Sequence, residues 1–143
     1  MSIDWEKLVK ELESCFWSAF SETVIDHAKN PRNLGNIQDE SSYAYLTGQC
    51  GDTIQIWVKI EEDMIKEITF WTDGCGTTIA SGSMVTELAK GKNIADALQI
   101  TPLEVLEALG GLPDESVHCA ILATNTLQEA LKKYQRQCRE NKE

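Results

Sequence analysis

Hydrophobic and polar residues alternate in the middle of the chain, which predicts β-structure there. Between residues 53 and 60, isoleucine or valine occupies every second position, and the positions between them are mostly polar. A turn at 61–63 leads into a second predicted strand at 64–72, and residues 43–47 form a third. Three successive strands joined by short connections predict an antiparallel meander with one buried face and one partly wet face.

The flanking regions have helical spacing instead. Ser21 is a candidate N-cap, and Pro31 ends the helix that follows it. Thr101 to Glu104 form a capping box with proline at the first helical position. Helices are predicted over 2–15, 21–30, 77–90, 102–109 and 117–139. Gly91 is the predicted C-cap of the helix at 77–90, and a linker that begins at Gly110 leads into the last helix. The predicted fold is α+β, with a small antiparallel three-stranded sheet and helices packed on one face.

Composition narrows the class of protein. The chain has 143 residues and a net charge of −10, so nucleic acid and anionic membranes would repel it. We find no apolar run near the ~20 residues of a membrane span and no signal-peptide pattern. Five cysteines are an odd number and match no compact disulfide framework. The expectation is a cytoplasmic protein with reduced thiols, without nucleic acid or membrane partners.

Three short islands carry the candidate chemistry: Cys50-Gly51-Asp52, Gly74-Cys75-Gly76 and His118-Cys119. Each cysteine lies at a predicted junction between elements, and such junctions gather at one end of a sheet. A helix N-terminus, predicted at Cys75 and Cys119, favours the thiolate. Thiolates select zinc, copper(I) or iron–sulfur clusters. The islands therefore predict one thiolate-rich site.

The fourth ligand of this site stays open between Asp52 and His118. A permanent cluster normally has four cysteines, so three thiolates with a harder fourth ligand should hold a cluster less firmly. Plainer alternatives exist: Asp52 as a turn residue, His118 as a helix cap, and Cys75 as filler between two glycines. Cys15 and Cys138 have no such neighbours and fit small core residues better.

Taken together and in order, these motifs resemble NifU/IscU-type iron–sulfur cluster assembly scaffolds. The resemblance runs from about residue 20 to 134. It is carried by Val24-Ile25-Asp26-His27, Asn30-Pro31-Arg32-Asn33-Leu34-Gly35, Cys50-Gly51-Asp52, Gly74-Cys75-Gly76 with Ile79-Ala80-Ser81-Gly82-Ser83, and His118-Cys119 with Ala120-Ile121-Leu122-Ala123.

The resemblance implies a scaffold, not a turnover enzyme. It implies that a nascent [2Fe–2S] cluster is bound by Cys50, Cys75 and Cys119, with Asp52 and His118 as further ligands. It also implies that zinc can occupy the same site and that Cys119 accepts persulfide sulfur. The corresponding domains are an N-terminal helical extension at 1–19 and the scaffold domain at 20–139.

The implied partners are a cysteine desulfurase, apo iron–sulfur recipient proteins, a frataxin-like iron regulator and ferredoxin. The family often has Leu-Pro-Pro-Val-Lys before the His-Cys pair, read by an Hsp70-type chaperone. Here Leu112-Pro113-Asp114-Glu115-Ser116 keeps only the first two of those residues, which argues against that chaperone.

Two rival functions remain. One is a zinc-bound sulfur acceptor that stimulates a desulfurase, and the other is a structural zinc domain. The zinc-dependent relatives lengthen the segment before the third cysteine and lack the histidine. The presence of His118 therefore favours the cluster scaffold.

Overall fold

The computed structural model describes residues 4–8, 11, 20–49 and 51–141. Of the predicted helix at 2–15, residues 5–8 and 11 are helical, and the remainder lies outside the described residues. Cys15 and Cys50 also lie outside them. The described elements are α2 (Glu22–Lys29), β1 (Ser42–Thr47), β2 (Thr53–Glu61), β3 (Met64–Thr72), α3 (Gly76–Ala89), α4 (Ile94–Leu98), α5 (Pro102–Leu109), the 3₁₀ helix η1 (Asp114–Ser116) and α6 (Val117–Asn141).

The three strands form one antiparallel sheet in the order β1-β2-β3, which confirms the predicted meander and the α+β class. The alternating apolar residues of β2 all point inward and are buried. The other face carries a different set of side chains, since Tyr45 and Trp71 are exposed there and both pair with Gln55. One face is therefore buried and the other partly wet, as the alternation predicts.

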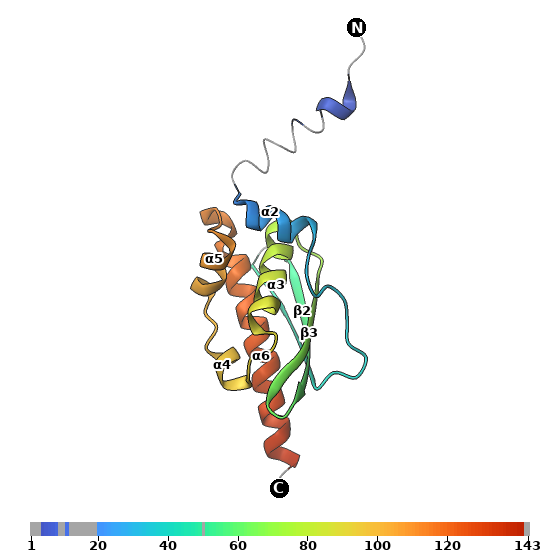
Figure 1. The fold of residues 1–143 in the computed structure, drawn as a ribbon, viewed down its shortest axis with the longest axis vertical. Helices are drawn as coiled ribbons and strands as arrows, with labels where there is room; N and C mark the ends of the chain where they lie inside the picture. Colours follow the sequence, from blue (N-terminus) through green and yellow to red (C-terminus); the bar gives the residue numbers. More distant parts are fainter. Residues whose placement is uncertain (1–3, 9–10, 12–19, 50, 142–143) are drawn as a thin grey trace.

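Helices α3 and α6 cover the buried face of the sheet, with α4 and α5 outside them (Figure 1). The core contains Phe70 and Ile56 from the sheet and Leu127 and Leu131 from α6, all fully buried. The predicted last helix thus supplies part of the core. In Figure 1, α3 and α6 both begin at the end of the fold opposite the C-terminus.

Helix α3 is buried almost all round. It contacts β3, α2, α5 and α6, so small and polar side chains fill much of its surface. Gly82 lies against the ring of Phe70, and a Cβ there would come within 2.6 Å of a ring carbon. The helix therefore packs as a central element, and small residues allow the close approach.

Local signals placed most boundaries correctly. The Ser21 hydroxyl accepts from the backbone N–H of Val24 and caps α2, and Thr101 does the same for α5. Two short elements were not predicted: α4, capped by Asn93, and η1 within the predicted linker. The C-cap of α3 is Lys90, one residue before the predicted Gly91. Helices of three to five residues show too little periodicity to be recognised.

Side-chain hydrogen bonds join α2 and the loop after it to α3. His27 Nδ1 lies 2.7 Å from Ser83 Oγ, and the backbone N–H of Arg32 donates to the same oxygen at 2.9 Å. Asn33 Nδ2 donates to Thr86 Oγ1 at 3.1 Å. This part of the resemblance therefore holds α2 and the loop after it against α3.

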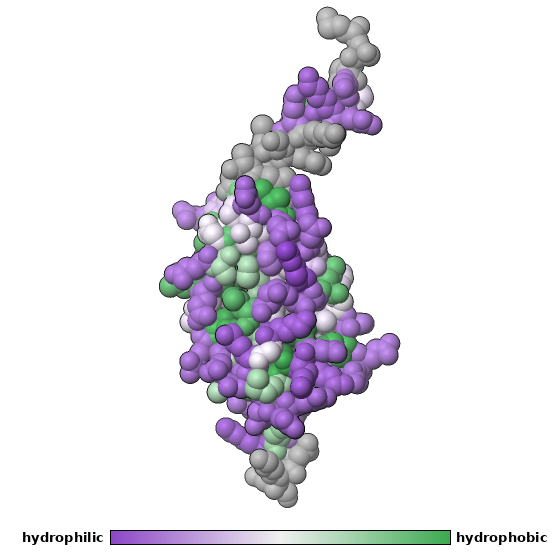
Figure 2. Space-filling view, in the orientation of Figure 1, coloured by the Kyte–Doolittle hydropathy of each residue, from purple (hydrophilic) through white to green (hydrophobic). Residues whose placement is uncertain are grey.

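The face of the molecule seen in Figure 2 is mostly hydrophilic. Small apolar patches lie between the hydrophilic residues. Within the described part of the chain, no helix combines the length and apolarity needed to cross a membrane.

Candidate metal and sulfur site

The fold brings the predicted site segments to one end of the sheet. The β1–β2 connection, the β3–α3 junction and the beginning of α6 all lie at the end opposite the C-terminus (Figure 1). Cys75 is the N-cap of α3, as its position before a helix suggested. Cys119 is the third residue of α6, and His118 the second. Cys50 belongs to the β1–β2 connection and lies outside the described residues.

Two cysteines meet around a hydroxyl group. Thr77 Oγ1 lies 3.2 Å from Cys75 Sγ and 3.5 Å from Cys119 Sγ. The threonine is buried in the first turn of α3, between the two sulfurs. Two of the predicted ligands, on different helices, are thus brought together as expected.

Asp52 joins the same group through the next residue of α3. Thr78 Oγ1 donates to Asp52 Oδ2 at 2.9 Å and lies 3.4 Å from Cys119 Sγ. Its distance to Cys75 Sγ is 3.7 Å, close to the limit for a contact with sulfur. One carboxylate and two thiols therefore converge on a single buried hydroxyl.

The turn before β2 directs Asp52 toward α3. The Gly48 N–H donates to the Asp52 carbonyl at 2.8 Å, and the Gly51 N–H donates to the Gly48 carbonyl at 3.0 Å. Gly51 has φ +86°, a conformation that glycine adopts without strain. A Cβ on Gly48 would lie 3.1 Å from Leu122, so this turn also packs against α6.

The two described cysteines of the site differ in burial and in pKa. Cys119 is only 2% exposed, and burial raises the pKa of its thiol although both threonine hydroxyls oppose this. Cys75 is exposed. Burial tends to raise the pKa of Cys75 too, but hydrogen bonds with Thr77 and Thr78 outweigh it and lower that pKa. The thiolate was predicted to be favoured at both helix starts. The lowered pKa of Cys75 agrees with this prediction, whereas the prediction is wrong for Cys119, because desolvation raises the pKa of its thiol.

His118 lies at the border of this cluster. Its Nε2 is 3.7 Å from Cys119 Sγ. Among the described residues, no three histidine, cysteine, aspartate or glutamate side chains stand close enough to hold one metal ion. The soft thiols and the hard carboxylate are nevertheless a donor set that suits iron or zinc.

Sequence reasoning missed the two threonines. Thr77 and Thr78 follow the Gly74-Cys75-Gly76 island directly, but hydroxyls in a first helical turn are common and carry no special pattern. Only the three-dimensional arrangement shows that they link the predicted ligands.

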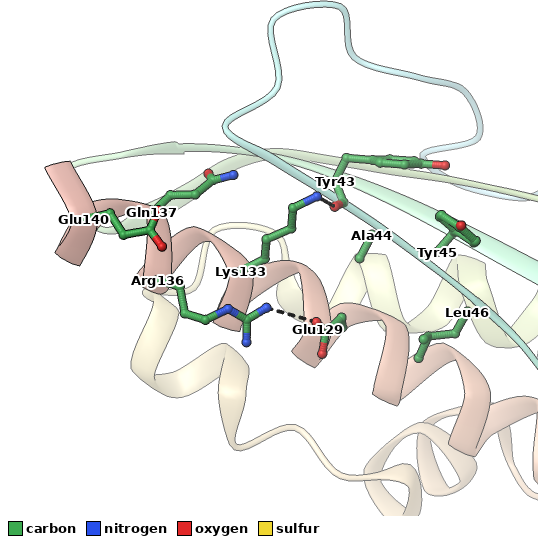
Figure 3. Close-up of a pocket in the computed structure, with 9 residues that line it drawn as sticks. All are labelled: Tyr43, Ala44, Tyr45, Leu46, Glu129, Lys133, Arg136, Gln137 and Glu140. Carbon is green, nitrogen blue, oxygen red and sulfur yellow. Dashed lines mark hydrogen bonds and ion pairs between the residues drawn. The ribbon is translucent and has the colours of Figure 1, made fainter.

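A groove of about 630 Å³ lies elsewhere, between β1 and α6 (Figure 3). Its lining includes no cysteine and none of the predicted ligands. Arg136 forms an ion pair with Glu129 at 3.1 Å, and Lys133 Nζ donates to the Tyr43 carbonyl at 3.2 Å. β1 is an edge strand of the sheet, and the Lys133 ammonium group lies against one of its backbone carbonyls. A lysine placed along an edge strand discourages pairing with strands of other molecules.

Comparison with known proteins identifies the family. The model of the NifU-like N-terminal domain matches residues 19–141, so the chain belongs to that family. The chain is 45% identical over 116 residues to iron–sulfur cluster assembly scaffold protein IscU 1 of Archaeoglobus fulgidus, which covers 80% of this chain and 76% of that protein. It is 40% identical over 121 residues to scaffold protein IscU of Escherichia coli K12, covering 81% and 94%.

A solved structure supports the fold independently of sequence. The N-terminal part of a nitrogen-fixing NifU-like protein from Brucella abortus superimposes with a TM-score of 0.68 at 12% identity, covering 85% of this chain and 97% of that one. This likeness confirms the fold, and the family model and the IscU relatives confirm the family resemblance drawn from the motifs.

Proposed function

We propose that the chain is a scaffold on which a [2Fe–2S] cluster is assembled from iron and desulfurase-derived sulfur, and from which the cluster passes to apo-proteins. The observation that carries the proposal is the convergence of Asp52, Cys75 and Cys119, from three separate segments, on two buried hydroxyls. The names of the relatives support the same function. A scaffold of this kind builds and hands on a cargo and is not a turnover enzyme.

Cys50, Cys75 and Cys119 are the proposed thiolate ligands, and Asp52 and His118 are the proposed further ligands. Asp52 is the better placed fourth ligand, because its carboxylate shares the Thr78 hydroxyl with Cys119. The same donors suit zinc, so zinc is expected to compete for the site. A hard carboxylate among thiolates binds the soft cluster weakly and favours release.

Cys119 is the proposed persulfide acceptor. Since it is buried here, sulfur transfer requires the start of α6 to move toward the donor. The preceding Gly110 and Gly111 have φ values of +80° and +95°, and glycine tolerates the change of backbone angle that such a movement needs.

The proposed partners follow from this role. They are a cysteine desulfurase, apo iron–sulfur recipients, a frataxin-like iron regulator and ferredoxin. Cys75, Cys119 and Cys138 are free thiols, which supports a reducing compartment, and we place the protein in the cytoplasm. The domain proposal remains an N-terminal extension at 1–19 followed by the scaffold domain at 20–139.

Anaerobic reconstitution tests the function. The chain would be incubated with a cysteine desulfurase, cysteine, a thiol reductant and ferrous iron, and then analysed for visible absorption, iron and acid-labile sulfide. We expect a coloured cluster on the wild type and none on Cys75→Ser. Cys138→Ser is the matched control, because Cys138 lies 19 residues along α6 from Cys119, about 28 Å at the helical rise, and should leave the cluster intact.

A colourless protein that binds zinc and stimulates the desulfurase would contradict the cluster scaffold and favour the zinc-bound sulfur acceptor. Zinc binding without any effect on the desulfurase would instead favour a structural zinc domain.

A further inference from the structure

Thr78 occupies a position that neither the motifs nor the proposed ligand set explains. Its side chain is fully buried, yet its hydroxyl is hydrogen-bonded to the carboxylate of a different segment. A hydroxyl has one hydrogen to donate and two lone pairs to accept with. Because Asp52 Oδ2 accepts from the Thr78 hydroxyl, the Thr78 hydrogen points to Oδ2, and the lone pairs remain for the thiol of Cys119 at 3.4 Å.

The backbone beside this contact leaves no spare room. A Cβ built on Gly74 would lie 2.7 Å from Thr78 Cβ and 2.8 Å from Asp52 Oδ2. The Gly74 N–H donates to Thr72 Oγ1 at 3.0 Å, and that hydroxyl donates to the Thr53 carbonyl at 2.7 Å, which ties this strand end to β2. The absence of a side chain at Gly74 therefore creates the space in which the carboxylate and the hydroxyl meet.

We propose that Thr78 is a positioning residue that holds the Asp52 carboxylate in the site and so increases its affinity for a metal ion. The inference rests on the proposed function, in which that ion is the iron of a nascent cluster. A carboxylate has about four lone-pair positions, so Oδ2 can keep the Thr78 hydrogen bond while Asp52 accepts an ion. Hydrogen-bonding partners behind a ligand typically contribute ~10–100-fold in metal affinity.

Thr77 differs from Thr78 in what it can do. Its hydroxyl lies near the sulfurs of Cys75 and Cys119, whereas the contact to Asp52 belongs to Thr78. Thr78 can therefore change the affinity for a metal ion through Asp52. Thr77 could change that affinity only through its contacts with the two thiols.

The test measures the zinc affinity of the metal-free, reduced chain by competition with a chromophoric chelator. Thr78→Val removes the hydroxyl and keeps the shape, and we expect zinc affinity to fall ~10-fold or more. Thr78→Ser should restore it to nearly the wild-type value. Thr126→Val is the matched control, because Thr126 is equally buried and its hydroxyl donates within α6, to the Leu122 carbonyl. That control should bind zinc like the wild type.

A second comparison shows whether the effect passes through the carboxylate. In an Asp52→Ala background, Thr78→Val should cause no further loss of zinc affinity. An unchanged affinity in Thr78→Val alone, or an undiminished loss in the Asp52→Ala background, would overturn the inference. Should the valine variant fail to fold, Thr78→Ala, which relieves crowding, replaces it in both comparisons.

The outcomes also separate this inference from the function itself. A wild-type chain that binds no zinc and builds no cluster contradicts the proposed function. A wild-type chain that does both, with Thr78→Val equal to it in zinc affinity, contradicts only the role of Thr78.

Discussion

Cys75 and Cys119 both approach one hydroxyl, with their sulfurs 3.2 and 3.5 Å from Thr77 Oγ1. The first sulfur is exposed and the second is buried. In the structure the two thiols are therefore already adjacent, but only one of them faces solvent. Binding of an ion between them would replace the contacts with the hydroxyl by bonds to metal.

Asp52→Ala should make the assembled cluster last longer. The hard, hydrated carboxylate opens the site to exchange, and its removal leaves the sulfur ligands without that exchange route. The lifetime would be measured from the decay of visible absorption after a chelator is added to the reconstituted protein. Asp73→Ala is a useful comparison, because Asp73 is not among the proposed ligands and its Oδ1 accepts from the Thr53 N–H at the beginning of β2. Decay in Asp52→Ala as fast as in the wild type, or faster, would show that Asp52 does not confer lability.

Zinc should raise the melting temperature of the metal-free protein. Binding to the folded state alone stabilises it by about 2.7 kcal/mol when free zinc is a hundredfold above Kd. For a chain near this size, 1 kcal/mol corresponds to roughly 2–4 °C. Differential scanning fluorimetry with and without zinc would measure the shift, and Cys75→Ser should reduce it. An unchanged melting temperature in the wild type would argue against convergence of the three cysteines on one ion.

Cys119→Ser should abolish persulfide transfer from a desulfurase, whereas Cys138→Ser and Cys15→Ser should leave it intact. The reason is the placement of Cys119 at the beginning of α6, behind a glycine-containing linker that permits movement. Mass spectrometry of the chain after mixing with desulfurase and cysteine would locate the added sulfur.

The main competitor for that sulfur is Cys75, because it is the exposed thiol of the pair. A persulfide found mainly on Cys75 would show that transfer occurs in the arrangement described here, without movement of α6. A persulfide found mainly on Cys50 or Cys138 would contradict the assignment to Cys119.

His27 should make the metal-free protein less stable in mild acid. Burial lowers the pKa of its imidazole below 6.5, Arg32 adds to this, and the nearby carboxylates of Asp26 and Glu87 oppose it. The unfolded chain therefore binds a proton at a higher pH than the folded chain does. The stabilisation is present above about pH 6.5 and is lost as the pH falls through the lowered pKa of the folded state.

Chemical denaturation between pH 7.5 and 5.5 would measure this dependence. One differentially bound proton contributes at most about 1.4 kcal/mol per pH unit to the free energy of unfolding. In His27→Gln that part of the slope should be missing, while other acid-sensitive groups keep theirs. Equal slopes in the two proteins would mean that His27 takes up its proton alike in the folded and unfolded chains.

The elements of the fold were largely predictable because the signals for them are local. Strand β3 has the bounds that its pattern predicted, and Ser21 and Thr101 cap the helices that they were expected to cap. The alternation that specifies a strand repeats every two residues, and a capping side chain bonds to a backbone N–H three residues away. Both signals therefore involve only a few neighbouring positions. The sequence therefore contains those signals in readable form.

The candidate site was predicted from the joint occurrence of the three islands. The structure brings Asp52, Cys75 and Cys119 close to one another, whereas their roles as ligands stay a prediction. The pKa of Cys119 was predicted in the wrong direction, because the helix start was visible in the sequence and the burial was not. Desolvation depends on every segment that packs around the sulfur.

What the sequence by itself determined is the set of strands and long helices, the family, and the residue types available for binding a cluster. Only the tertiary structure decided that α3 is buried almost all round, that Cys119 is inaccessible, and that Thr78 meets Asp52 beside Gly74. The physical reason is range. Hydrogen bonds within turns and helices join near neighbours, whereas burial and the contacts of this site join side chains from separate segments, which no local pattern records.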